Sequence, residues 1–323
     1  MSKSTEIVGI DVSKDTLDVY SVLKGSSSYP NNHKGYQLLL KTYGVGSHYV
    51  MESTGSYHHQ LAMYLHERTI RVSVVNPLVV KRFIQMKLNR NKTDKSDAKM
   101  ICHYGEEQVL DLWEPNPEYV EQSKDIYTTL DTYLKQQTAL KNKLHSLSTK
   151  GVITGILVRS LKRQLKHLKT EISCLEEALK ELMKEHQNSL YTRLKSVPGI
   201  GDKTAMLLIV STNGFKDFES DRQVSSYFGL APTERTSGSS IRGRSRISKV
   251  GNKQVRNHLF LCSFTASYCN PQCKALYERL VNKGKSKKLA LIAVANKLIK
   301  QSYGIAKSGL MYDPNYRSVL IRE

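Results

Sequence analysis

Four acidic residues occupy positions from which their carboxylates could hold divalent cations. Asp11 and Glu52 each follow a short apolar run that predicts a strand, and open α/β sheets place their ligands at the carboxyl ends of strands. Asp94 and Asp97 lie three residues apart, which puts both on one face if their segment is helical. Carboxylates gathered in one cleft repel one another unless protons or hard cations such as Mg²⁺ compensate. Two such ions can activate the attacking oxygen and stabilise the leaving oxygen in phosphodiester transfer.

Each of these acids, taken singly, also has an ordinary structural explanation. Asp11 or Glu52 alone is better explained as an acceptor of turn or cap hydrogen bonds. Asp94 could cap a helix, with Asp97 as an acid favoured in the first turn by the helix dipole. The presence of all four is what favours a metal site.

A loop rich in serine, glycine and arginine, residues 233–251, is the second candidate site. From residue types alone it is most simply a flexible loop that binds phosphate. A second interpretation makes one serine a nucleophile, with arginines stabilising the charge that grows on phosphate. No neighbouring histidine or lysine can be identified in the sequence as the base for that serine.

A third candidate is the segment VPGIGDKTA at residues 197–205, which has the form of a helix-hairpin-helix turn. Gly199 and Gly201 free the backbone for close approach, and amides at the start of the next helix can bind phosphate without reading bases. Such a turn could merely connect two helices. Because a helix and further cations such as Lys203 follow in a strongly basic segment, binding to a nucleic-acid backbone is favoured.

The charge of the chain indicates a polyanionic partner. Its 323 residues include 49 Lys and Arg against 29 Asp and Glu, a net charge of +20 with a pI of about 9.6. The excess is +4 over residues 1–110, +1 over 111–187 and +15 over 188–323, so the last segment is expected to bind the polyanion most heavily. The sequence predicts no signal peptide, no membrane span and five reduced cysteines.

Patterns of apolar residues predict three domains. Residues 1–115 read as α/β, with strands near 7–10, 17–23, 49–51 and 72–75 and helices near 57–68 and 78–103 in a mixed sheet covered by helices. Residues 116–187 carry two heptad seams, which predict a helical coiled-coil connector with a turn within 150–160. The seams could pack on each other or on another subunit, and we favour at least one intermolecular contact. Residues 188–323 are predicted to be mainly helical, with candidate helices at 190–211, 223–229, 254–268 and 287–303.

Four segments of the first domain together resemble a known family. These are VGIDVSK at 8–14, MESTG at 51–55, NP at 76–77 and NKTDKSDA at 91–98. They resemble the RuvC-like, RNase H-like domain of the DEDD transposases, the Piv/MooV-type recombinases of insertion sequences, some of which are guided by a bridge RNA. The resemblance implies that Asp11, Glu52, Asp94 and Asp97 are metal ligands.

The serine-rich loop resembles the S-G-S-S-x-R-G motif of the same family, whose first serine attacks DNA. That position is Ser237, with Ser239 and Ser240 as alternatives. The phosphates would be held by Arg242, Arg244, Arg246 and Lys249. The helix-hairpin-helix turn also occurs in the family, which adds Gly199, Gly201 and Lys203 as nucleic-acid contacts.

The resemblance implies a transposase that cuts and rejoins DNA through a serine, assisted by Mg²⁺. The partners that it implies are donor and target DNA, a bridge RNA, and further copies of the chain in a dimer or tetramer. The basic residues of 81–99 could contribute to binding the RNA. The protein is then expected in the prokaryotic cytoplasm, associated with the nucleoid.

Two other classes of function stay open on the residues alone. One is a metal-dependent nuclease or junction resolvase that uses water and needs no serine. The other is a non-catalytic scaffold that binds nucleic acid, in which the acids are caps and the basic loop is an anchor.

Overall fold

A computed structural model describes residues 5–53, 55–87, 94–150, 154–233, 236–237, 241–242, 246–248 and 250–316, with the backbone alone at 94–95, 236–237 and 241–242. The chain forms two compact units, residues 1–116 and 117–323. The connector expected over 116–187 thus belongs to the same unit as the C-terminal segment. Four candidate residues lie outside the described residues: Ser239, Ser240, Arg244 and Lys249.

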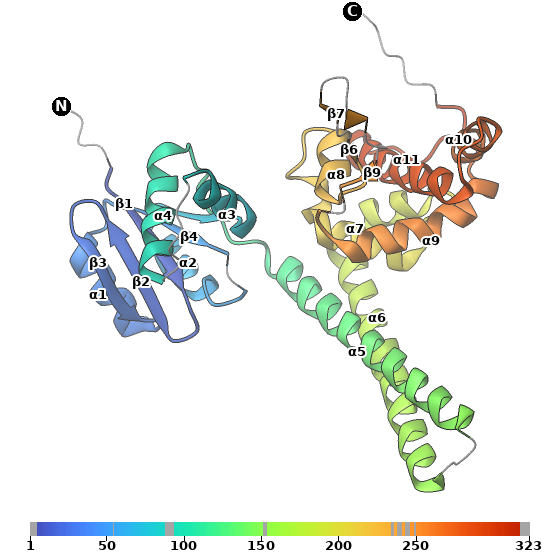
Figure 1. Ribbon diagram of the computed structural model, residues 1–323, viewed down its shortest axis with the longest axis horizontal. Coiled ribbons are helices and arrows are strands. Elements are labelled where there is room, and N and C mark those ends of the chain that lie inside the picture. The colour runs from blue at the N-terminus through green and yellow to red at the C-terminus, as the bar shows by residue number, and fades with distance from the viewer. Residues whose placement is uncertain are drawn as a thin grey trace, which may run out of the picture. The chain divides into compact units, whose positions relative to one another are not determined.

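The first unit is built on a five-stranded mixed sheet in the order β3-β2-β1-β4-β5 (Figure 1). Its strands are β1 (Ile7–Val12), β2 (Thr16–Ser21), β3 (Gly25–Pro30), β4 (His48–Glu52) and β5 (Val72–Val75). The first three are antiparallel neighbours, whereas β4 is parallel to both β1 and β5. The mixed sheet and the hairpin of β1 with β2 confirm the sequence prediction. β1 continues through Asp11 rather than ending before it, because Asp11 still pairs with β2.

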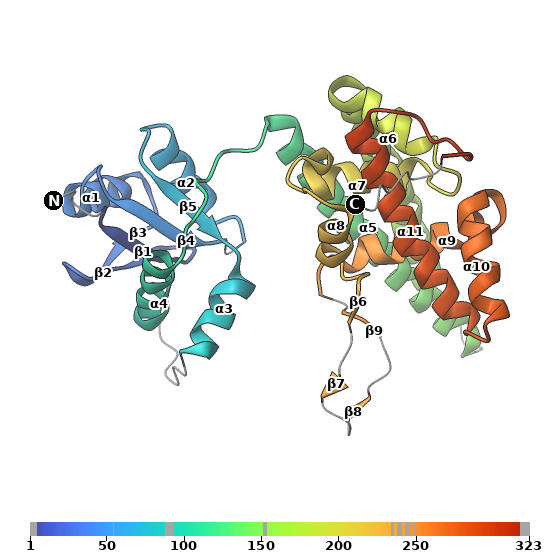
Figure 2. The same cartoon turned by 90° about the horizontal axis from the view of Figure 1, so that it is seen from above.

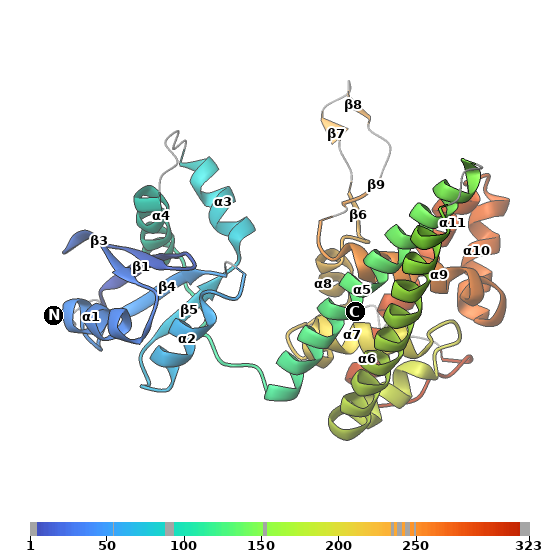
Figure 3. The same cartoon turned by 90° about the horizontal axis from the view of Figure 1, so that it is seen from below.

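Helices cover both faces of this sheet, as Figure 2 and Figure 3 show. One face packs against α1 (His33–Tyr43) and α2 (His59–His66), and the other against α3 (Pro77–Met86) and α4 (Asp94–Glu107). Val8, Ile10 and Val12 are buried on the face of α1 and α2. Because side chains alternate along a strand, Gly9 and Asp11 belong to the face of α4.

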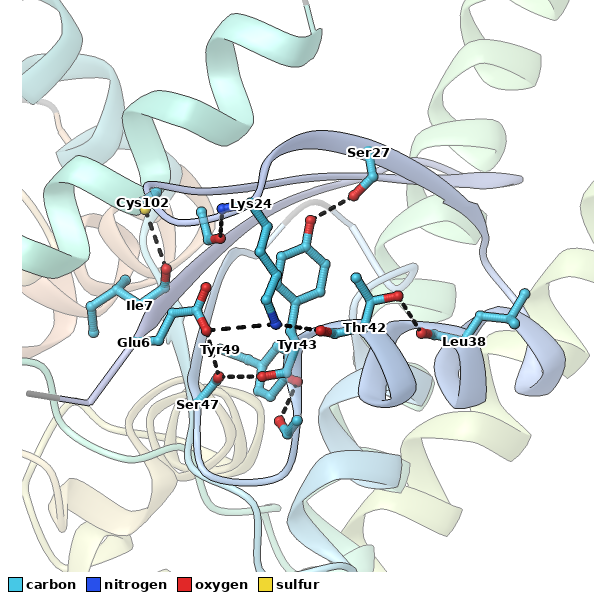
Figure 4. A network of polar contacts seen from close by, with 12 residues as sticks. Glu6, Ile7, Lys24, Ser27, Leu38, Thr42, Tyr43, Ser47, Tyr49 and Cys102 are labelled. Atoms are coloured by element: carbon cyan, nitrogen blue, oxygen red, sulfur yellow. Dashed lines mark hydrogen bonds and ion pairs between the residues drawn. The ribbon is translucent and has the colours of Figure 1, made fainter. Parts of the chain in front are cut away.

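Polar contacts fasten α1 to the edge of the sheet (Figure 4). Tyr43 and Ser27 share a hydrogen bond between their hydroxyl oxygens at 2.5 Å, and Ser47 donates its hydroxyl to the Tyr43 carbonyl at 2.6 Å. Lys24 reaches the Thr42 carbonyl and lies 3.9 Å from a carboxylate oxygen of Glu6. These contacts tie α1 to β3 and to the segment that leads into β4.

Two glycines allow α4 to lie directly on the sheet. A Cβ atom at Gly9 would lie 2.3 Å from the backbone nitrogen of Cys102 and 2.4 Å from the carbonyl oxygen of Ala98. A Cβ at Gly105 would lie 2.8 Å from the Ile7 side chain. The thiol of Cys102 donates to the Ile7 carbonyl at 3.4 Å, and burial raises its pKa to about 11. At Gly9 the helix backbone therefore rests on β1 with no side chain between them, and at Gly105 the helix rests on the Ile7 side chain.

The second unit begins with a long helical hairpin of α5 (Glu118–Thr149) and α6 (Gly155–Lys195). The two helices pack on each other within one chain, and their seam residues Leu130, Ile172 and Leu179 are buried. The turn is shorter than expected over 150–160, because α6 already begins at Gly155. The predicted contact of a seam with another subunit stays a prediction.

The remaining helices share one apolar core with α7 (Asp202–Thr212), whose residues from Thr204 to Val210 are all buried. They are α8 (Asp221–Tyr227), α9 (Lys253–Cys269), α10 (Pro271–Asn282) and α11 (Lys287–Ser308). The sequence predicts α8, α9 and α11 but not α10. Side chains that accept backbone N–H groups cap several helices of both units: Asn32, Asn76, Ser220, Asn252, Asn270 and Ser286. No helix among the described residues is both long and apolar enough to cross a membrane.

We predict that Gly9→Ala lowers the free energy of unfolding of the first unit by about 2–3 kcal/mol, because the new methyl group meets backbone atoms of α4 that cannot turn aside. Urea unfolding would measure the loss, and alkylation of the Cys102 thiol would report whether α4 has lifted. Gly46→Ala is the matched control, since no atom lies within 4 Å of its Cβ position, and it should stay within about 0.5 kcal/mol. Equal effects of the two substitutions would contradict the packing.

Candidate active site

Two of the predicted ligands stand side by side on neighbouring strands. In the parallel pairing of β1 with β4, Ile10 lies opposite Met51, so the next residues along, Asp11 and Glu52, also lie next to each other. Neighbouring strands are about 4.8 Å apart, and both residues are half-buried. Glu52 shares the α4 face with Val50, as Asp11 does with Gly9. The two carboxylates therefore belong to one end and one face of the sheet.

The start of α4 lies over the same end of the sheet. Gly105 packs over Ile7, and Ala98 and Cys102 pack over Gly9, so α4 runs antiparallel to β1. Continuing this series by one step brings the first turn of α4 to Asp11. Asp94 begins the helix, although its side chain lies outside the described residues, and Asp97 is half-buried one turn further on.

The register also places a fifth acid that the resemblance does not include. Asp18 of β2 lies directly opposite Asp11, on the face it shares with Tyr20. The ring of Tyr20 packs 6.1 Å from that of His103 in α4, which confirms that this face is covered by α4. The hairpin spacing of the sequence could have located Asp18, because register follows once the turn is fixed.

These acids offer only oxygen ligands, the type that hard divalent cations prefer. Asp11 and Glu52 suit such an ion because their backbones are held by the sheet rather than by a loop. Among the side chains that the structure describes, which do not include that of Asp94, no three His, Cys, Asp or Glu residues are spaced to hold a metal ion. The donor set fits a divalent cation.

The serine-rich segment contains two short antiparallel strand pairs, which we call the ribbon (Figure 3). Its described parts are β6 (Pro232–Thr233) paired with β9 (Arg246–Ile247), and β7 (Thr236–Ser237) paired with β8 (Ile241–Arg242). Thr233 donates its hydroxyl to the Arg246 carbonyl at 2.9 Å, which closes the first pair. Ser237 lies opposite Ile241 in the second pair. The sequence predicts this segment only as a loop.

An arginine missed by the sequence analysis holds the base of this ribbon. Arg256 of α9 donates through Nη1 to the carbonyls of Phe228 at 2.9 Å and Gly251 at 3.0 Å, where the chain enters and leaves the ribbon. The two ends touch: a Cβ at Gly229 would lie 2.1 Å from the Val250 carbonyl oxygen. Gly229 also has φ of +67°, which glycine adopts readily. Both ends of the ribbon are thus fixed to α9.

Most of the helix-hairpin-helix candidate makes contacts with other parts of the protein. Gly199 has φ of +104°, and a Cβ there would lie 2.7 Å from that of Ala266, so this glycine serves packing against α9. Gly201 is open, with no atom within 4 Å of its Cβ position. The ammonium group of Lys203 lies 2.5 Å from a carboxylate oxygen of Glu176. Open backbone at Gly201 is the part of the turn that best suits a phosphate.

The acid at the start of α7 is also compensated. Lys195 Nζ lies 2.6 Å from Asp202 Oδ1, and the Tyr191 hydroxyl donates to the same oxygen at 2.9 Å. These hydrogen bonds, that of Lys195 first, lower the pKa of Asp202. The carboxylate therefore stays charged to lower pH than usual, and Lys195 offsets the repulsion that it would exert on a phosphate at the hairpin.

The fold and these acids are compatible with an RNase H-like domain followed by a helical unit. A family model for DEDD transposases of the IS110 type matches residues 8–150, and a model for the transposase IS116/IS110/IS902 family matches residues 191–278. The pilin gene-inverting protein of Moraxella bovis is 30% identical over 97% of this chain and 98% of its own length. The transposase for insertion sequence element IS1111A of Coxiella burnetii is 25% identical over 80% of this chain and 76% of its own.

The chain belongs to the IS110-type family of DEDD transposases, enzymes that act on DNA by cutting and rejoining it. DEDD transposases generally depend on a divalent metal ion.

We predict that Arg256→Met loosens the base of the ribbon, because the methionine has a similar length but donates no hydrogen bond to the two carbonyls. Hydrogen exchange at residues 246–248 and 250–251 should accelerate by about tenfold, while α10 and α11 exchange as before. Arg279→Met, at an exposed position of α10, is the matched control and should leave these amides unchanged. Identical exchange in both variants would show that Arg256 does not hold the ribbon.

Proposed function

We propose that this transposase joins itself to DNA through Ser237 while Asp11, Glu52, Asp94 and Asp97 bind Mg²⁺ beside the same phosphate. The observation that carries the proposal is the strand register that sets Asp11 next to Glu52 beneath the first turn of α4. The motif around Ser237 and the relationship to a pilin gene-inverting protein support it. The acids of one unit and the serine of the other would meet in the assembled complex, within one chain or between two.

In the proposed reaction the Ser237 hydroxyl attacks a DNA phosphorus, forming a phosphoserine bond as one strand leaves with a free hydroxyl. Asp11, Glu52, Asp94 and Asp97 would hold the cation, which when bound would stabilise the charge that develops on the phosphate during attack and departure. Arg242, Arg244, Arg246 and Lys249 hold neighbouring phosphates, as do Gly201 and Lys203 of the helix-hairpin-helix turn, which Gly199 shapes by packing on α9. Attack by a hydroxyl of the partner strand on phosphoserine then rejoins the DNA and releases the serine.

We further propose that a bridge RNA guides this reaction and that the protein works as a dimer or tetramer. Base pairing by the RNA would select donor and target sites, leaving the protein to contact mainly backbone. The cations of residues 81–99 could serve that RNA. A DNA substrate would place the site of action at the nucleoid in the prokaryotic cytoplasm.

Ser237→Ala should abolish the covalent link between protein and DNA. We expect adduct formation to fall at least about 10³-fold, because the nucleophile is gone, while binding of DNA is retained. The measurement combines protein, labelled DNA, RNA transcribed from the ends of the element and Mg²⁺, followed by a denaturing gel. Ser239→Ala and Ser240→Ala are the controls and should form the adduct. Cleavage at the normal rate by Ser237→Ala would favour a nuclease that uses water.

Asp11→Asn and Glu52→Gln should each slow strand cleavage by about 10²–10³-fold, since each removes a charged ligand. Neither should destabilise the protein without metal, because each relieves repulsion between neighbouring carboxylates. The rise in melting temperature on adding Mg²⁺ or Mn²⁺ should shrink in both variants.

Asp15→Asn, in the exposed turn between β1 and β2, is the control for both substitutions and should cleave normally. If Asp11→Asn kept full cleavage activity, the acids would not form the site. Mixing Ser237→Ala with Asp11→Asn protein then tests whether two chains complete one site, because only a shared site regains activity.

A further inference from the structure

The connector helices carry a sharp division of charge that their near-zero net charge conceals. Residues 132–170, the far end of the hairpin, contain nine Lys and Arg and no Asp or Glu. The flanking parts of the connector, residues 111–131 and 171–187, contain eleven Asp and Glu and only three Lys. We call residues 132–170 the basic arm. Its net charge of +9 sits on 39 residues.

All nine cations of the basic arm are exposed, and they are Lys135, Lys141, Lys143, Lys150, Arg159, Lys162, Arg163, Lys166 and Lys169. The helices α5 and α6 belong to the same compact unit as α7 to α11. Figure 1 shows that the far end of the α5–α6 hairpin projects away from those other helices. The apolar seam closes α5 and α6 on each other, with Leu168 buried at 7% exposure. The fold therefore uses the seam and leaves the cations to solvent.

Spacing gathers part of this charge into a stripe. Arg159, Lys162, Lys166 and Lys169 recur at intervals of three and four residues, which places them on one face of α6. Ten residues of helix span about 15 Å. Along that length one strand of a nucleic-acid duplex presents about four phosphates. The stripe thus matches a phosphate backbone in both spacing and sign.

We propose that the basic arm is a binding surface for the phosphate backbone of a nucleic acid. This surface is separate from the ribbon and from the helix-hairpin-helix turn at residues 197–205. A second copy of the arm is disfavoured as its occupant, because two surfaces of +9 repel each other. The flanking residues 111–131 and 171–187, with their excess of acids, would repel the same backbone. The hairpin therefore directs a nucleic acid to its far end.

The test compares two sets of three substitutions on the same helices. The arm variant is Lys162→Gln with Lys166→Gln and Lys169→Gln, and the matched control is Lys124→Gln with Lys180→Gln and Lys184→Gln. Both sets remove three charges and keep good helix formers. Lys124 and Lys180 pair with Glu121 and Glu177, so their charges are already offset. The full chain with Ser237→Ala is used throughout, so that binding is measured without chemistry.

Binding to a DNA duplex and to an RNA duplex of the same sequence is measured between about 50 and 200 mM salt. For the arm variant we expect at least tenfold weaker binding and a salt slope smaller by about two to three, since each lost phosphate contact removes about 0.9 on B-DNA. The control should change by less than about threefold. A loss on DNA alone, on RNA alone or on both identifies which backbone the arm holds.

Equal changes in the arm variant and the control, on both duplexes, would overturn the proposal. Matching circular dichroism and melting temperatures would establish that both variants are folded. Because no cleavage is measured, this result stands apart from the serine chemistry. If no covalent adduct formed at Ser237, the proposal for the basic arm would still stand. If the basic arm bound no nucleic acid, the proposal for Ser237 would still stand.

Discussion

The close contact between the backbone of α4 and that of β1 at Gly9 is the constraint on which the first unit depends. The absence of a side chain at this position lets the helix lie against the strand, with Ala98 and Cys102 filling the space. The same contact sets the direction of α4 and brings its first turn to the end of the sheet where Asp11 and Glu52 stand. Because Val8, Ile10 and Val12 of β1 face α1 and α2, the alternate positions Gly9 and Asp11 belong to the α4 face, where the strand carries a polar side chain at its end.

Much of this arrangement could be predicted from the sequence, for identifiable reasons. The apolar runs of β1, β4 and β5 and the heptads of α5 and α6 are strong signals, because each element buries side chains at its own period. β3 has no such signal, since half of Gly25–Pro30 is serine and the strand owes its conformation to pairing with β2. Asp11 interrupts the apolar pattern of β1, so the end of that strand was expected too early. Functional residues commonly break local rules in this way.

Contacts made by backbone groups were beyond the reach of residue patterns. Arg256 holds two carbonyls that lie 28 and 5 residues away along the chain, and no motif records carbonyl positions. At Gly199 the sequence motif predicted a close approach of the backbone to phosphate, whereas in the structure the backbone lies close to Ala266. The charge division of the connector was present in the sequence but was averaged away by counting over 111–187 as a whole. Counting the charges separately over 111–131, 132–170 and 171–187 reveals it.

The way the ribbon is anchored bears on how its length can vary. Its ends, near Gly229 and Gly251, are fixed to the helices below, so the segment between them behaves as a closed loop attached at one point. The entropy lost on closing such a loop grows only logarithmically with its length, by about 0.6 kcal/mol for each doubling. Insertions or deletions at the outer end should thus leave the helical unit nearly as stable as before. Evolution can reshape the outer part of the ribbon without rebuilding the helices that support it.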